Sequence, residues 1–302
     1  MRKQPFRGTG TALVTPFKSD GSLDEKALRR FVDFQIADGI DMLLPCGTTG
    51  EGATLDREET DRVIQIVVEQ TAGRVPVIVG AGSNSTAKAV RSTRRAKQLG
   101  ASGVLSVGPY YNKPTQQGYY EHFKAIAESE DIPVVIYNVP GRTAGNIEAG
   151  TMLRLAEIPN IVGVKEASGS IAQIMEILRD RPAGFSVLSG DDALTLAVIA
   201  LGGDGVVSVV SNEVPGMMRA MVDAALDGNF TEARVLNNKM LPLMNANFVE
   251  SNPIPVKAAL AMMGLIEENY RLPLVPMSPA NRDRLRELIE SLGLVQHAGV
   301  QK

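Results

Sequence analysis

The sequence contains few of the residues that hold metals or form disulfides. It has one cysteine, Cys46, and two histidines, His122 and His297. One cysteine excludes an intrachain disulfide, and this set is too small for a structural zinc site of the usual cysteine and histidine type. Because neither histidine lies near Cys46 in the sequence, we interpret its thiol as buried and inert rather than nucleophilic. We expect no metal at the functional site.

Long apolar runs and blocks of one charge are also missing. No stretch approaches the roughly 18 consecutive apolar residues that indicate a membrane-spanning helix. Residues 1–7 are basic but lead into a glycine and threonine segment without an apolar core, so we expect no signal peptide. With 31 basic and 34 acidic residues the net charge is −3, and no basic block marks a nucleic-acid surface. The sequence therefore predicts a cytoplasmic protein without nucleic-acid or membrane partners.

The 302 residues show a repeated alternation of short apolar runs with amphipathic stretches of helical period. The apolar runs predict strands at residues 12–14, 42–45, 75–79, 103–107, 133–137, 161–165, 186–188 and 206–209. The stretches between them carry apolar residues at helical spacing, for example in 24–37 and 57–70. Eight such units, without a Gly-x-Gly-x-x-Gly turn, favour a closed α/β barrel, the (β/α)8 TIM barrel, over an open doubly wound sheet.

The alternation ends after the eighth unit. Residues 230–249, 255–263 and 280–292 are predicted as helices without an intervening strand. We therefore divide the chain into a catalytic barrel, a C-terminal helical appendage and a flexible polar tail, at residues 1–228, 229–295 and 296–302. We expect the appendage to cover one face of the barrel and to contact other subunits.

Lys165 stands at the end of the apolar run Ile161–Val164. Desolvation disfavours the ammonium form of a lysine at a buried strand end, so its pKa falls and more of it is the nucleophilic amine. Such a lysine can form a Schiff base with a carbonyl substrate. From this segment alone, a lysine that reaches solvent or pairs with Glu166 is the alternative.

Polar residues follow other predicted strands, at the end where barrel enzymes place their chemistry. The second strand leads into Gly47-Thr48-Thr49-Gly50-Glu51-Gly52, whose amides and hydroxyls suit a carboxylate or phosphate. The fifth ends in Tyr137, with Arg142 just beyond it. Each also has an alternative explanation, because the turn could be purely structural, the tyrosine part of the core and the arginine solvated.

Two more strand ends carry aromatic or acidic pairs. Tyr110 and Tyr111 follow the fourth strand, and adjacent tyrosines in a loop need a partner surface. Asp191 and Asp192 precede a predicted helix, so we interpret them as capping residues rather than as an acid–base pair. A lysine with phenols, threonine hydroxyls and an arginine fits carbonyl chemistry through an iminium.

These motifs resemble those of the dihydrodipicolinate synthase family, within the pyruvate-dependent class I aldolases. The matching segments are 47–51, 110–112, 137–143, 163–166, 189–192 and 248–257. The resemblance implies a lyase that condenses pyruvate with L-aspartate 4-semialdehyde, in the first committed step towards diaminopimelate and lysine. The alternative is a pyruvate-releasing aldolase or lyase acting on a sugar acid, N-acetylneuraminate or 2-keto-3-deoxygluconate. Arg142 favours the synthase, because sugar-acid members tend to carry other residues there.

The resemblance implies catalytic roles for four residues and no cofactor beyond a covalent imine. Lys165 would form this imine with pyruvate. Tyr137 would transfer protons to and from it, and Thr48 and Tyr111 would complete a relay of hydroxyls. A neighbouring subunit supplies Tyr111 in this family, which implies a homo-oligomer, usually a tetramer made of two tight dimers.

Four further residues would bind the substrates. Thr49 would hold the pyruvate carboxylate and Arg142 the semialdehyde carboxylate. Gly190 and Val207 would line the site through backbone groups.

Lysine-sensitive relatives bind L-lysine at the tight-dimer interface, through a glutamate just past the Asn84 position and histidines on an adjoining helix. This chain has Lys88 in place of that glutamate, and Arg57 and Thr60 in place of the histidines. Because the charge is reversed, we expect L-lysine to inhibit weakly or not at all.

Overall fold

The computed structural model describes residues 6–295, so His297 and the predicted tail 296–302 lie outside the described residues. Its parallel strands form one sheet in the order β2-β1-β8-β7-β6-β5-β4-β3. A bridge between Leu43 and Val77 links β2 to β3 and closes the barrel. The predicted TIM barrel is confirmed. The strands are β1 (Gly8–Ala12), β2 (Met42–Leu44), β3 (Ile78–Gly80), β4 (Gly103–Val107), β5 (Val134–Asn138), β6 (Ile161–Glu166), β7 (Ser186–Ser189) and β8 (Gly205–Ser208).

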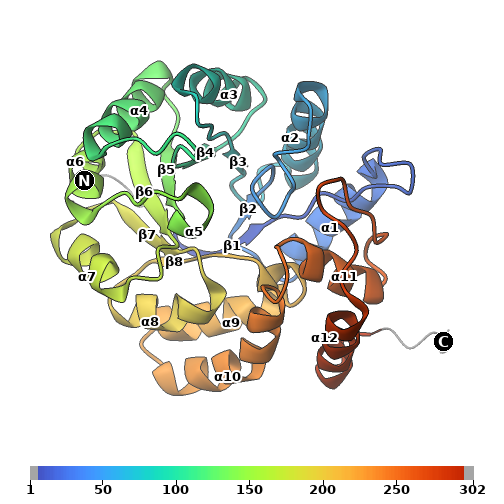
Figure 1. Cartoon of the computed structure of the whole chain (residues 1–302). Coiled ribbons are helices and arrows are strands. Elements are labelled where there is room, and N and C mark those ends of the chain that lie inside the picture. The colour runs from blue at the N-terminus through green and yellow to red at the C-terminus, as the bar shows by residue number, and fades with distance from the viewer. Residues whose placement is uncertain (1–5, 296–302) are drawn as a thin grey trace.

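Helices follow the strands and surround the barrel (Figure 1). They are α1 (Glu25–Ala37), α2 (Arg57–Thr71), α3 (Thr86–Gln98), α4 (Gln116–Ser129), α5 (Pro140–Thr143), α6 (Ala149–Ala156), α7 (Ile171–Asp180), α8 (Thr195–Ala200) and α9 (Pro215–Leu226). Two short 3-10 helices, η1 (Asp192–Leu194) and η2 (Val210–Asn212), follow β7 and β8. The chain continues with α10 (Phe230–Ala246), α11 (Ile254–Met262) and α12 (Pro279–Ser291). None of the helices within residues 6–295 is long and apolar enough to cross a membrane.

The first strand differs from its prediction. It covers Gly8–Ala12, whereas the sequence indicated residues 12–14. Glycine and threonine gave this segment no apolar signature, yet all five residues are buried. Gly10 is needed for close packing, because a Cβ there would lie 2.5 Å from Cγ of Met42 on the neighbouring strand. The other seven strands overlap their predicted ranges.

Successive residues of a strand face two different cores, as the pleat requires. On β2, Met42 and Leu44 belong to the cluster inside the barrel, whereas Leu43 packs between the strands and the helices. On β5, Tyr137 belongs to the inner cluster and Ile136 to the outer one. The chemistry of the barrel therefore depends on which residues at the strand ends face inward.

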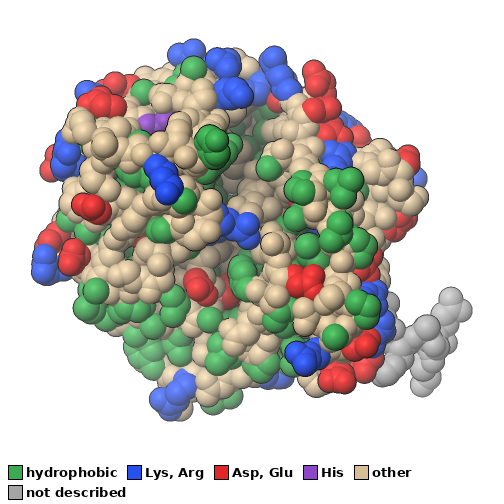
Figure 2. Space-filling model, in the orientation of Figure 1, with side chains coloured by type: hydrophobic (Ala, Val, Ile, Leu, Met, Phe, Trp, Pro, Cys, Tyr) green, Lys and Arg blue, Asp and Glu red, His purple; other side chains and the backbone are tan. Residues whose placement is uncertain are grey.

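The carboxyl ends of the strands face the viewer in Figure 1, because α5, which directly follows β5, crosses in front of them. A recess opens near the middle of this face (Figure 2). The helix α11 lies beside this face, while α10 and α12 pack further out (Figure 1). α10 contacts α9, and α12 contacts both α10 and α11. The C-terminal helices thus bring α11 close to the open end of the barrel.

Candidate active site

Lys165 lies at the carboxyl end of β6, and only 6% of its surface is exposed. Its Nζ lies 4.4 Å from the centre of the Tyr137 ring. Burial lowers the pKa of Lys165 to about 8, although the nearby Asp192 carboxylate opposes the shift and Arg142 adds to it. The part of the chain that the structure describes gives Lys165 no ion-pair partner. A much larger fraction of this amine than of an ordinary lysine is therefore uncharged near neutral pH.

Glu166 does not pair with Lys165. It is buried, and its carboxylate accepts hydrogen bonds from the Ser168 amide at 2.7 Å and the Asn138 side chain at 3.1 Å. Gln173 donates a further bond to it. Adjacent residues of a strand point to opposite faces, so these partners hold Glu166 away from the Lys165 amine. This excludes pairing with Glu166, and burial excludes a lysine that reaches solvent.

Tyr137 lies opposite Lys165 in the pairing of β5 with β6. It is buried, and burial raises the pKa of its phenol to about 12, while Arg142 lowers this pKa slightly and Asp191 raises it slightly. The hydroxyl therefore stays protonated at physiological pH and has a proton to give. The phenol and the amine form the centre of the site.

The turn after β2 holds Thr49 buried and leaves Thr48 exposed. Its backbone is tightly folded, because a Cβ on Gly52 would lie 2.3 Å from the Cys46 carbonyl oxygen. The Asn252 side-chain amide donates a hydrogen bond of 3.0 Å to the Thr49 hydroxyl. A hydroxyl that accepts this bond keeps its own hydrogen for another acceptor. Thr49 can therefore donate to a carboxylate.

Arg142 lies on the short helix α5 with its side chain exposed. Its Nη2 donates to the backbone carbonyl of Asn252 at 3.4 Å. Its charge lowers the pKa of both Lys165 and Tyr137, which places it close to the centre of the site. Asn252 therefore contacts both residues predicted to bind carboxylates.

Gly190 lies beside the side chain of Lys165, and Val207 lies in the core inside the barrel. A Cβ on Gly190 would lie 3.0 Å from Cε of Lys165, so the lysine stem packs against this glycine. Val207 is a buried residue of β8 and belongs to the cluster inside the barrel.

Tyr111 is set apart from the other predicted site residues. It is 90% exposed and adopts a left-handed backbone with φ of 72°. Within residues 6–295 no hydrogen bond joins the hydroxyls of Thr48, Tyr111 and Tyr137. The predicted relay is therefore not assembled within one chain as described.

Asp191 caps the short helix that follows β7, as predicted, whereas the Asp192 side chain binds backbone amides at the start of η2 instead. Asp191 accepts a hydrogen bond from the Ala193 amide at the start of η1. Asp192 accepts bonds from the amides of Val209 and Val210, beyond the end of β8. Cys46 is also buried as predicted, and burial raises the pKa of its thiol to about 12. Among the described residues no three acidic, cysteine or histidine side chains gather to hold a metal.

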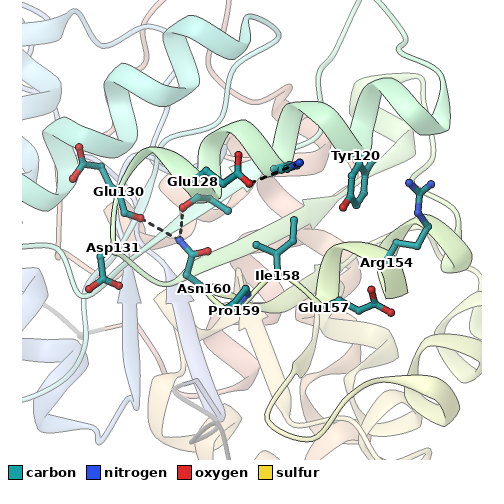
Figure 3. Close-up of a pocket in the computed structure, with 11 residues that line it drawn as sticks. Tyr120, Glu128, Glu130, Asp131, Arg154, Glu157, Ile158, Pro159 and Asn160 are labelled. Atoms are coloured by element: carbon teal, nitrogen blue, oxygen red, sulfur yellow. Dashed lines mark hydrogen bonds and ion pairs between the residues drawn. The ribbon is translucent and has the colours of Figure 1, made fainter.

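A different hollow, of about 610 Å³, lies between α4 and α6 on the outer wall of the barrel (Figure 3). The Arg154 guanidinium lies over the Tyr120 ring, 4.3 Å from its centre. Asn160 donates hydrogen bonds to the carbonyls of Ala127 and Glu130 (Figure 3). These polar groups are engaged with one another, and the hollow lacks a buried nucleophile, so we keep the candidate site at the carboxyl ends of the strands.

Sequence reasoning missed two side chains that support the site, Asn252 and Lys257. Both come from the C-terminal region, and Lys257 forms a buried ion pair with Glu51 in the turn after β2. One signal was available, because Lys257 interrupts the otherwise apolar segment Ile254–Met262.

The barrel and its buried strand-end amine define a lyase of the class I aldolase type, in which a lysine forms an imine with the substrate. The profile of the Dihydrodipicolinate synthetase family matches residues 5–292, and the chain belongs to this family.

Relatives of known name and structure agree with this assignment. The 4-hydroxy-tetrahydrodipicolinate synthase of Koribacter versatilis is 58% identical over 98% of this chain and 99% of its own length. That of Syntrophus aciditrophicus is 54% identical over 96% of this chain and 99% of its own. The crystal structure of the dihydrodipicolinate synthase from Aquifex aeolicus superimposes with a TM-score of 0.94 at 47% identity, covering 96% of this chain and 99% of that one. These names support the synthase and not the sugar-acid alternative.

Proposed function

We propose that this chain catalyses the condensation of pyruvate with L-aspartate 4-semialdehyde to 4-hydroxy-tetrahydrodipicolinate, in the route to diaminopimelate and lysine. The observation that carries this proposal is the amine of Lys165, which is buried at a strand end beside a protonated phenol. The choice of substrates is supported by relatives that bear the synthase name, because the similarity covers almost the full length of this chain and of each relative.

In this mechanism the neutral amine of Lys165 attacks the keto carbon of pyruvate. A carbon–nitrogen bond forms, and the keto oxygen takes up protons and leaves as water. Tyr137, whose ring centre lies 4.4 Å from the amine, serves as the proton donor, because its hydroxyl keeps its proton at physiological pH. Loss of a methyl proton from the imine gives an enamine, whose carbon attacks the aldehyde of the second substrate, and the aldehyde oxygen takes up a proton to become the hydroxyl of the product. The amino group of the second substrate then attacks the imine carbon, which closes the ring and releases the Lys165 amine. The catalytic group is the covalently bound lysine, and the proposal needs no cofactor.

Two groups suit the two substrate carboxylates. The Thr49 hydroxyl accepts from Asn252 and keeps its hydrogen for the carboxylate of pyruvate. The exposed guanidinium of Arg142 suits the carboxylate of the semialdehyde, with which it can form two parallel hydrogen bonds. In this proposal Gly190 and Val207 line the site through backbone groups.

We also propose that the active form is a homo-oligomer, a tetramer built from two tight dimers, acting in the cytoplasm. Tyr111 is exposed and adopts a left-handed backbone conformation. Such a residue costs conformational free energy and exposes apolar surface unless a partner surface packs against it. The Tyr111 hydroxyl would complete the relay with Thr48 and Tyr137 of the adjoining subunit.

The test is turnover with purified protein in an assay coupled to the condensation product. We expect pyruvate and L-aspartate 4-semialdehyde to be converted faster than N-acetylneuraminate or 2-keto-3-deoxygluconate is cleaved. Faster cleavage of either sugar acid would overturn the proposal.

A further inference from the structure

A buried ion pair joins the C-terminal region to the turn after β2. The Nζ of Lys257, on α11, lies 2.5 Å from Oε1 of Glu51. The two side chains are 0% and 1% exposed, and 206 positions separate them in the sequence. A pair so far from solvent is stable only if further contacts hold both charges.

Those contacts come from an aromatic and basic cluster around the pair. The Nζ of Lys257 lies 4.4 Å from the centre of the Phe17 ring and 5.4 Å from that of Tyr270. The second carboxylate oxygen of Glu51 accepts from the backbone amide of Arg271 at 3.4 Å. The Arg271 guanidinium covers Phe17 and also binds Glu59. The Glu51 carboxylate is therefore held by Lys257 and Arg271, which both lie outside its own turn.

The backbone of Glu51 transmits this constraint to the threonines. Its amide donates to the Thr48 carbonyl at 3.1 Å, and its φ of 52° is in the left-handed region. A non-glycine residue keeps such a conformation only where its surroundings fix it. The same C-terminal segment contributes Asn252, whose amide donates to Thr49. The position of the Thr49 hydroxyl thus depends on two contacts from residues 252–257.

We propose that Lys257 is a positioning residue for pyruvate, which acts by pairing with Glu51 and so fixes the turn that presents the Thr49 hydroxyl. This proposal rests on the function proposed above for Thr49. A protein with a buried ion pair is often no more stable than one with apolar or neutral residues of similar size in its place. We therefore assign this pair the role of fixing the shape of the turn.

The test compares wild type with Lys257→Met, Glu51→Gln and the double variant. Each single change leaves one buried charge unpaired, so it lowers Tm as well as pyruvate binding. The double variant removes both charges and regains most of the lost Tm. We expect it nevertheless to need about tenfold more pyruvate for half-maximal labelling of Lys165 by borohydride, with less than about a twofold change in KM for the semialdehyde.

The matched control is Lys97→Met, which removes a lysine from the surface ion pair with Glu130. We expect it to leave pyruvate labelling unchanged. A double variant that regains both Tm and wild-type pyruvate labelling would overturn the proposal, because the pair would then serve stability alone. If the single variants do not fold, pyruvate labelling of the double variant alone tests the proposal.

Labelling also separates this proposal from the proposed function, since it needs no second substrate. Wild type that is labelled by pyruvate but does not convert the semialdehyde would overturn the synthase, while the variants still test Lys257. Wild type without any pyruvate label would overturn both.

Discussion

Burial of Lys165 sets the pH at which its amine becomes nucleophilic. Its pKa of about 8 in the folded protein lies below the ordinary lysine value of about 10.4, because the ammonium form is poorly solvated. The pKa of Tyr137 is about 12, so the phenol remains protonated over the same range. The phenol therefore adds no step of its own to the pH dependence of imine formation over this range.

The rate of imine formation should rise with pH and level off above about 8. Below the pKa each unit of pH lowers the neutral fraction about tenfold, so the rate at low pyruvate falls in proportion. The measurement is the initial rate of pyruvate-dependent inactivation by borohydride from about pH 6 to about pH 9.5. Because Arg142 lowers the pKa of Lys165, Arg142→Leu should move the midpoint upward. A midpoint above about 10 in wild type would show that Lys165 is not desolvated.

Among the elements, the end of β7 packs directly against the catalytic lysine. A Cβ on Gly190 would lie 2.8 Å from Cβ of Ala167 and 3.0 Å from Cε of Lys165. Gly190→Ala should therefore displace the amine, and a displacement near 1 Å lowers kcat by about 10²-fold. The matched control is Gly150→Ala on α6, where nothing lies within 4 Å of the added methyl. Comparison of kcat and Tm for both variants tests this, and wild-type kcat in Gly190→Ala would refute it.

Residues at the strand ends were predictable because a barrel brings its strand ends together whatever lies between them. Lys165, Tyr137 and Gly190 are gathered in this way. The prediction for the first strand was shifted from its true range, Gly8–Ala12. Glycines that allow close packing there give the sequence no apolar periodicity.

The contact between Lys257 and Glu51 was not predictable, since it depends on how α11 returns to the barrel. Periodicity shows that a helix exists and not where it docks. The division of the chain at residues 228 and 295 also depends on how the C-terminal helices pack, so it stays a prediction.

At the scale of the whole molecule, the exposed Tyr111 predicts complementation between defective chains. In a mixed oligomer of Tyr111→Phe and Lys165→Ala chains, one site combines an intact lysine with an intact tyrosine. Such mixtures should exceed the activity of either parent, measured after joint refolding. The control mixes Tyr111→Phe with the double variant Lys165→Ala/Tyr111→Phe, in which no site combines an intact lysine with an intact tyrosine. Activity no higher than this control would contradict shared sites.

The surface around α3 predicts weak regulation by L-lysine. Lys88 is exposed on α3. The family resemblance implies that lysine-sensitive members carry there a glutamate that receives the ligand's ammonium group. Two unit charges about 4 Å apart interact by roughly 4 kcal/mol at an effective dielectric near 20. Lys88 can turn into solvent and avoid most of this repulsion, but loss of the anionic partner alone weakens binding about tenfold.

Initial rates at saturating pyruvate with added L-lysine check this prediction. Half-inhibition below about 1 mM, where binding is worth roughly 4 kcal/mol, would contradict it. Lys88→Glu is the informative variant, and it should lower the concentration of L-lysine needed for inhibition.

The central claim is that Lys165 forms an imine with pyruvate, and mass spectrometry after borohydride reduction tests it most directly. Reduction in the presence of pyruvate should add one reduced pyruvyl group to the chain, on the peptide that contains Lys165. Lys165→Arg should gain no such mass, while reduction without pyruvate should leave wild type unmodified. An unmodified wild-type chain, or an adduct on another lysine, would contradict the account.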